Sequence, residues 1–183
     1  MLTTSPMHPR FRELRAYLTD AREGLLTTVS GLTPDQLQRR PAAEVWSPGE
    51  TLEHLRLTES SIVKVLRKLL READLNRLGP ESETSSVMGA LDAFRLVEVV
   101  QRVPAPAFVQ PDPRADGQAA LVGLGQSRAQ LIEVVARADG WAVGSLRFPH
   151  PLIGPLDFYQ WVLFVGQHEV RHTCLIQRAL TTL

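Results

Sequence analysis

The chain has 183 residues, of which 44% are apolar and 22% charged, and its 20 basic and 20 acidic side chains cancel to a net charge of zero. This length favours a single domain over 1–183, and the balanced charge argues against a nucleic-acid surface, which normally carries a basic excess. No apolar run approaches the roughly 20 residues that cross a bilayer, and the first residues contain no export signal, so we expect a cytoplasmic protein without a nucleic-acid or membrane partner. The single cysteine, Cys174, excludes an internal disulfide and a cysteine-based zinc site.

The first half of the chain predicts two long helices. The first runs from Arg10 to about Leu32, is closed by a turn at 33–35, and has apolar residues at steps of three and four. The second begins at Ser47-Pro48-Gly49-Glu50, where the spacing of Ser and Glu is that of a capping box, and ends at Gly79-Pro80. The apolar faces are Phe11, Leu14, Leu18, Ala21, Leu25 and Val29 in the first helix, and Leu52, Leu55, Ile62, Leu66, Leu69 and Ala73 in the second.

The second half begins with a weaker pattern and ends with two further helices. Residues 85–103 contain at most a short or distorted helix, and four prolines over 104–113 predict an extended connection. A third helix is predicted over 118–138, a loop over 140–154, and a fourth helix from near Pro155 almost to the last residue. The third helix carries Leu121, Leu124, Arg128, Leu131 and Val135 on one face.

Four amphipathic helices with no convincing strand predict an all-α fold, a four-helix bundle. The connection over 80–117 is long enough to cross the length of the bundle, so the second and third helices can lie parallel. The shorter connections suit antiparallel neighbours.

The fourth predicted helix contains His168-Glu169-Val170-Arg171-His172, an H-E-x-x-H sequence. Residues four apart lie on one face of a helix, so the two imidazoles can share a metal ion. Both histidines also fall on the apolar stripe and should face the interior of the bundle. The alternative is a pair of core histidines, which would need hydrogen-bond partners. The stripe consists of Trp161, Val165, His168, His172, Leu175 and Ala179.

A catalytic zinc ion needs a third protein ligand. The 11 residues after His172 contain no Glu, Asp or His, and Leu175 and Arg178 stand where the extended peptidase motif has Gly and His. A metallopeptidase is therefore disfavoured, and the third ligand should lie upstream. The candidates are His8, His54 and His150, of which we favour His54 because it lies on a predicted helix and would be held rigidly.

Several segments together resemble the DinB-like (DinB/YfiT) superfamily. They are Trp46-Ser47-Pro48-Gly49-Glu50-Thr51-Leu52-Glu53-His54-Leu55, His150-Pro151 with Gly154-Pro155-Leu156, Trp161, and His168-x-x-x-His172. The resemblance spans nearly the whole chain. It implies an up-down-down-up bundle, frequently dimeric, that holds one divalent metal ion through His54, His168 and His172. Zinc and nickel both suit imidazole ligands.

Characterised members of that superfamily include metal-dependent thiol S-transferases and a thiol-dependent isomerase. The resemblance therefore favours transfer of a low-molecular-weight thiol, as co-substrate, to a small electrophilic molecule. Two alternatives stay open: a metal-dependent hydrolase with Glu169 as general base, and a non-catalytic metal-binding stress-response protein. Glu169 flanks the expected metal face, where it is a base, a partner of a ligand or a solvated surface residue. The loops around His150 and over 104–113 are the expected substrate contacts.

A homodimer is also expected, from the resemblance and from three apolar residues of the fourth helix. Leu163, Phe164 and Val170 lie partly off the main stripe and would leave apolar surface exposed in a monomer. Arg171 is expected at the surface or against a partner, and Cys174 in apolar packing.

Overall fold

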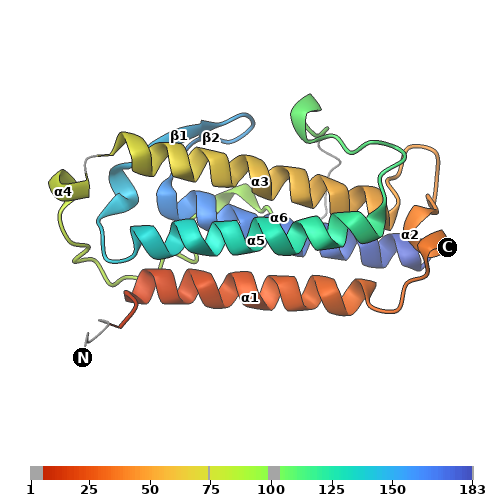
Figure 1. The fold of residues 1–183 in the computed structure, drawn as a ribbon, viewed down its shortest axis with the longest axis horizontal. Helices are drawn as coiled ribbons and strands as arrows, with labels where there is room; N and C mark the ends of the chain where they lie inside the picture. Colours follow the sequence, from red (N-terminus) through yellow and green to blue (C-terminus); the bar gives the residue numbers. More distant parts are fainter. Residues whose placement is uncertain (1–5, 74, 99–103, 183) are drawn as a thin grey trace.

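Four long helices form the body of the protein in the computed structural model, which describes residues 6–73, 75–98 and 104–182. They are α1 (Pro9–Val29), α3 (Pro48–Glu72), α5 (Gly117–Ala138) and α6 (Phe158–Leu180). Helices α1 and α6 run in one direction and α3 and α5 in the other, and the segment after α3 returns along the length of the bundle before α5 (Figure 1). The predicted four-helix bundle with up-down-down-up connection is confirmed.

Capping interactions determine where the helices begin. The Ser47 hydroxyl accepts the Glu50 N–H at 3.1 Å, and the Glu50 carboxylate accepts the Ser47 N–H at 2.8 Å, which confirms the predicted capping box at the start of α3. A second capping box joins Asp157 and Gln160 and starts α6 at Phe158. The fourth helix thus begins three residues after the predicted start near Pro155, because 154–157 form a strand.

Two predicted helix ends differ from the structure. The first helix ends at Val29, and the predicted turn at 33–35 is part of a short helix, α2 (Pro34–Gln38), with its own capping box between Thr33 and Gln36. The second ends at Glu72 and is followed by α4 (Leu75–Leu78) before Gly79, whose φ of +71° ends that short helix.

Among its described residues, the connection between α4 and α5 contains an isolated bridge from Pro80 to Trp141 and short turns. A 3-10 turn (Asp92–Phe94) lies in the predicted short helix over 85–103, of which 99–103 fall outside the described residues. A second 3-10 turn (Ala107–Val109) interrupts the predicted extended stretch over 104–113.

The prediction of no strand, and of a loop over 140–154, is wrong. After a 3-10 turn (Val143–Ser145), strands β1 (Arg147–His150) and β2 (Gly154–Asp157) form an antiparallel hairpin. Pro149 and Pro155 face each other, and such a pair can occupy a ladder position that needs no N–H donor. The prolines that argued against a strand are therefore compatible with an isolated hairpin.

The interior is filled by the predicted apolar faces, and one expectation about the surface is corrected. Leu163 and Phe164 are 0% and 6% exposed, so both are buried inside the protomer and offer no apolar surface to a partner. Of the three residues behind that expectation, Val170 alone is half-buried. The homodimer therefore remains a prediction drawn from the resemblance, to be tested by light scattering. Within the described residues, no helix combines the length and apolar character needed to span a membrane.

A close backbone approach between α3 and α5 gives a test of the packing. A Cβ at Gly49 would lie 2.9 Å from the Leu37 carbonyl oxygen and 3.3 Å from the Gly117 Cα. We therefore expect Gly49→Ala to lower the free energy of unfolding by about 1–3 kcal/mol. Gly24 in α1 has open space at its Cβ position, so Gly24→Ala should raise that free energy by up to about 1 kcal/mol. Urea unfolding of the two variants checks this, and equal effects would contradict the described packing.

Candidate metal centre

Three imidazoles from two antiparallel helices converge inside the bundle. His54 lies in the second turn of α3, and His168 and His172 lie one turn apart on α6. Their candidate ligand atoms are all within 4.8 Å of one another, and the Nε2 atoms of His54 and His168 are 3.3 Å apart. The structure thus brings together the three residues predicted from the sequence, which we call the histidine triad.

The geometry of the triad fits a metal ion. Two nitrogens bound tetrahedrally to zinc are separated by about 3.3–3.4 Å, close to the distance between the His54 and His168 nitrogens. The Val109 carbonyl oxygen lies 2.7 Å from His54 Nδ1 and can only accept, so Nδ1 carries the proton and Nε2 keeps its lone pair. His172 Nδ1 is buried and has no hydrogen-bond partner among the described residues, which is costly unless a further group satisfies it.

The electrostatics keep the triad neutral, which is the form that binds metals. Burial lowers the pKa of His168 and of His172 well below the ordinary value, and the nearby imidazoles and Arg171 lower both further. Burial also lowers the pKa of His54, and the hydrogen bond to Val109 partly offsets this effect.

These shifts predict how stability depends on pH in the metal-free protein. Between the lowered folded pKa values and the unfolded value of about 6.5, the unfolded chain binds more protons than the folded one. The free energy of unfolding should therefore fall as the pH drops below about 6.5, by up to about 1.4 kcal/mol per pH unit for each triad histidine. Urea unfolding between about pH 7.5 and 5.5 measures this slope. If the urea midpoint did not change over that interval, the triad histidines would have the same pKa values in the folded and unfolded protein, which would contradict the prediction.

Aromatic rings surround the triad. The Trp46 ring lies 4.9 Å from that of His54, and the Phe164 ring stacks on His168 with centroids 5.3 Å apart. His150, at the end of β1, packs against Phe164 at 4.7 Å, and its partly buried ring has a pKa lowered by that burial. His150 thus lies beside the site but outside the triad. His8, the third upstream candidate, precedes α1 and donates its backbone N–H to Asp139.

The connection before α5 contributes to the site in a way that the sequence did not predict. The 104–113 stretch was expected to contact substrate, and the contact that the structure shows is the Val109 carbonyl holding His54. Arg171 was expected at the surface or against a partner, but its guanidinium donates to the backbone carbonyls of Leu96, at 3.4 Å, and of Glu98. Arg171 thereby fixes this connection against α6 next to His172.

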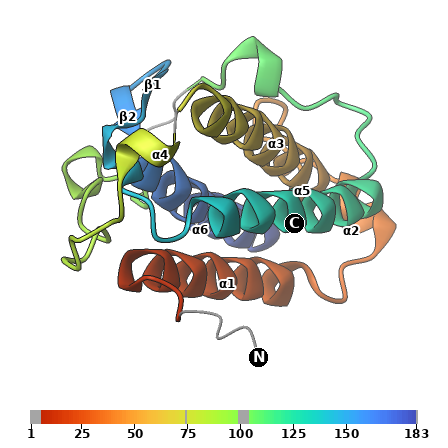
Figure 2. The ribbon, with the colours of Figure 1, turned by 60° about the vertical axis from the view of Figure 1, so that its left-hand side comes forward.

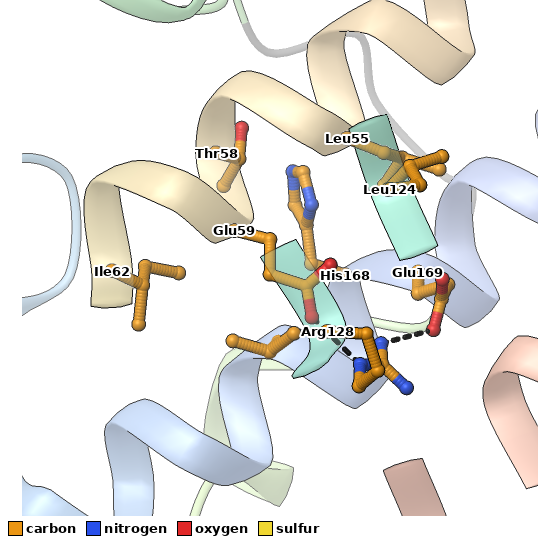
Figure 3. Close-up of a pocket in the computed structure, with 9 residues that line it drawn as sticks. Leu55, Thr58, Glu59, Ile62, Leu124, Arg128, His168 and Glu169 are labelled. Carbon is orange, nitrogen blue, oxygen red and sulfur yellow. Dashed lines mark hydrogen bonds and ion pairs between the residues drawn. The ribbon is translucent and has the colours of Figure 1, made fainter. Parts of the chain in front are cut away.

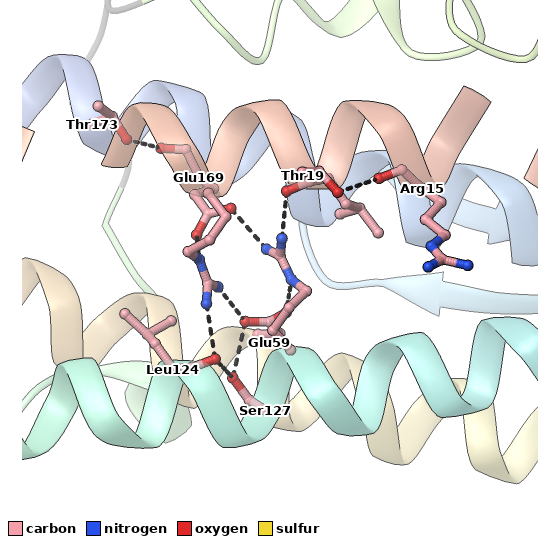
Figure 4. Close-up of polar contacts among 10 residues, drawn as sticks. Arg15, Thr19, Glu59, Leu124, Ser127, Glu169 and Thr173 are labelled. Atoms are coloured by element: carbon pink, nitrogen blue, oxygen red, sulfur yellow. Dashed lines mark hydrogen bonds and ion pairs between the residues drawn. The ribbon is translucent and has the colours of Figure 1, made fainter. Parts of the chain in front are cut away.

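Four charged side chains, one from each long helix, form a closed network of ion pairs next to the triad. Arg22 donates to Glu169 at 2.6 Å and to Glu59 at 2.9 Å, and Arg128 donates to Glu59 at 2.6 Å and to Glu169 at 2.7 Å (Figure 4). The Ser127 hydroxyl adds a bond of 2.9 Å to Glu59. The exposed fraction of the four charged side chains is only 2–12%. Two buried carboxylates are thus neutralised by two guanidinium groups.

The charge network directs the Glu169 carboxylate toward Arg22 and Arg128, whereas the predicted role as a general base places it beside the metal. Both carboxylate oxygens of Glu169 accept from an arginine, and the carboxylate is not among the groups that converge with the triad in the described structure. A cavity of about 10 Å³, enough for a single water, is lined by Glu59, Arg128, Glu169 and His168 (Figure 3). The role of Glu169 as a general base stays a prediction.

Comparisons with known proteins place this architecture in a family. The family model described as the DinB superfamily matches residues 17–176, most of the chain. The chain belongs to the DinB superfamily. The Bacillus subtilis (strain 168) "Uncharacterized protein YuaE" is 27% identical to this DinB superfamily protein over 160 residues, which are 84% of this chain and 88% of YuaE.

A solved structure supports the fold. "TT2238, a four-helix bundle protein" superposes with a TM-score of 0.60 and covers 92% of this chain and 98% of its own length. At 24% identity, this likeness bears on the fold alone. The superfamily and the bundle predicted from the sequence are both confirmed.

Proposed function

We propose that this DinB superfamily protein binds one divalent metal ion, zinc or nickel, through His54, His168 and His172. We further propose that it transfers a low-molecular-weight thiol to an electrophilic small molecule. The observation that carries the proposal is the convergence of three imidazoles whose lowered pKa values keep them neutral, with no carboxylate in the cluster. When bound, the divalent cation would keep its full charge and lower the pKa of an approaching thiol.

The surrounding residues have defined tasks in this proposal. Val109 orients His54, Phe164 supports the ring of His168, and Arg171 holds the connection before α5 in place. The thiol loses its proton to solvent, its sulfur forms a bond to the electrophilic carbon, and the leaving group departs with the electron pair of the broken bond. The chain thus supplies a rigid, neutral and partly apolar environment for the thiol.

The hydrolase alternative assigns the general base to Glu169. A general base must lie within hydrogen-bond reach of the water that it deprotonates. The Glu169 carboxylate instead accepts from Arg22 and Arg128, at 2.6 and 2.7 Å, and does not converge with the triad in the described structure. This arrangement favours thiol transfer over hydrolysis. The stress-response alternative shares the metal site and differs only in having no activity.

A thiol panel tests the proposal. The full chain is purified without a metal-affinity column, loaded with zinc or with nickel, and offered bacillithiol, mycothiol, glutathione or cysteine together with monochlorobimane. We expect at least one thiol to react faster than with the metal-free protein, and the gain to vanish in His168→Ala. Cleavage of esters or amides without any thiol transfer would favour the hydrolase, and no metal-dependent reaction of either kind would favour the non-catalytic protein.

A further inference from the structure

Apolar side chains lie against the triad, and exposed apolar residues lie near it in the sequence. Trp46 contacts His54 and Phe164 contacts His168, and three exposed apolar residues lie close in sequence to groups of the site. Val45 precedes Trp46, Phe108 precedes Val109, and Leu152 follows His150 by two residues. These three are 44%, 64% and 57% exposed, although leaving large apolar groups in water is unfavourable.

The exposed residues come from segments that lie on one side of the bundle. Figures 1 and 2 both show the β1–β2 hairpin and the last part of the connection before α5, over 104–116, on the α3 side, opposite α1. The hairpin reaches the triad through His150 and Phe164, and the connection reaches it through Val109 and His54. Leu152 and Phe108 therefore belong to the two segments that border the triad.

Two arginines pair with carboxylates in the first turns of α3, Arg40 with Glu50 and Arg56 with Glu53 at 2.6 Å. Arg171, whose charge acts on His168 and His172, donates to the backbone carbonyls of Leu96 and Glu98. A negatively charged substrate would have to compete with these carboxylates, whereas an apolar group gains from every exposed carbon that it covers. The border is thus suited to an uncharged, apolar group.

We propose that the electrophilic substrate carries an aromatic or alkyl group, which Phe108, Leu152 and Trp46 hold beside the triad. This inference rests on the proposed function, because it takes the triad as the place where the reacting atoms meet. It adds the class of substrate, since a small polar electrophile would leave these side chains exposed. The apolar area that the substrate buries against Phe108, Leu152 and Trp46 would provide affinity, while the three histidines form the reactive centre.

Hydroxamic acids test the inference apart from any reaction, because their head group binds divalent ions and their tail can be varied. The zinc-loaded full chain is titrated with acetohydroxamate, butyrohydroxamate, hexanohydroxamate and benzohydroxamate. We expect the affinity to rise by about fourfold for each buried methylene. Equal affinity for the acetyl and hexanoyl compounds would overturn the inference while leaving the metal site intact. No binding of acetohydroxamate above the metal-free control would overturn the metal site itself.

Matched surface variants locate the apolar contact. Phe108→Ser and Leu152→Ser should each reduce the preference for the hexanoyl over the acetyl compound by at least about threefold, with acetohydroxamate affinity unchanged. Val122 on α5 is the control, since it is 65% exposed, as Phe108 is at 64%, but belongs to neither of the two segments that border the triad. Val122→Ser should behave as the wild type. An equal loss in Val122→Ser would attribute the preference to general surface binding and contradict the assignment.

Discussion

Replacing Glu169 with Gln should lower the free energy of unfolding by about 3–5 kcal/mol, although the two side chains have nearly the same shape. The Glu169 carboxylate accepts from Arg22 and Arg128, and all three side chains are at least 88% buried. Gln removes one negative charge from a network of two carboxylates and two guanidinium groups, so a positive charge stays buried without compensation. We therefore expect Glu169→Gln to act mainly by destabilising the fold, and not by removing a catalytic group.

Two further variants separate this explanation from a general sensitivity to mutation. Glu53→Gln removes a carboxylate that pairs with Arg56 near the surface, and it should cost about 0.5 kcal/mol or less. The double variant Arg128→Met with Glu169→Met removes one charge of each sign, and it should be more stable than Glu169→Gln. Urea unfolding measures all three. A Glu169→Gln protein of wild-type stability that has lost only hydrolytic activity would instead support Glu169 as a base.

Replacing His168 with Ala should weaken zinc binding by more than about 100-fold, since loss of an outer partner of a ligand already costs 10–100-fold. His168 Nε2 lies 3.3 Å from His54 Nε2 and is one of three atoms that converge in the triad. Without it, two imidazoles remain, and two ligands do not complete a catalytic zinc site. Competition with a zinc-binding dye measures the affinity.

His150→Ala is the matched control for this experiment. His150 packs against Phe164 and lies close to the site, but it is not among the converging ligands. Its replacement should leave the stoichiometry at one zinc ion per chain. Loss of zinc in His150→Ala with retention in His168→Ala would reassign the third ligand.

The bundle and the triad were predictable because both depend on short-range periodicity. The stripes of α1, α3, α5 and α6 are three- and four-residue patterns, and the i, i+4 spacing of His168 and His172 places both rings on one face. His54 could be chosen because the capping box at Ser47 marks the start of a rigid helix two turns earlier. Local patterns therefore predicted both the four long helices and the three histidines that converge between α3 and α6.

The charge network escaped prediction although each helix carries a signal of it. Each of the four charges lies four residues after one member of a buried stripe and three residues before another, so each points inward. Which charges then pair depends on contacts between helices far apart in sequence, which periodicity does not contain. The four positions are Arg22 between Leu18 and Leu25, Glu59 between Leu55 and Ile62, Arg128 between Leu124 and Leu131, and Glu169 between Val165 and His172.

The hairpin escaped prediction for a different reason. Pro149, Pro151 and Pro155 within seven residues are typical of a loop, because proline cannot donate to a strand ladder. The register sets Pro149 opposite Pro155, and a two-stranded hairpin has outer edges that need no donors. The same register brings His150 against Phe164 and so completes one wall of the site.

The central claim is that the histidine triad holds one divalent metal ion, and anomalous diffraction tests it most directly. Crystals of the full chain, purified without a metal-affinity column and soaked in zinc, are measured above and below the zinc absorption edge. We predict a single anomalous peak with the nitrogens of His54, His168 and His172 at about 2.0–2.2 Å. A peak ligated by His150 or Cys174, or no peak between the three imidazoles at saturating zinc, would contradict it.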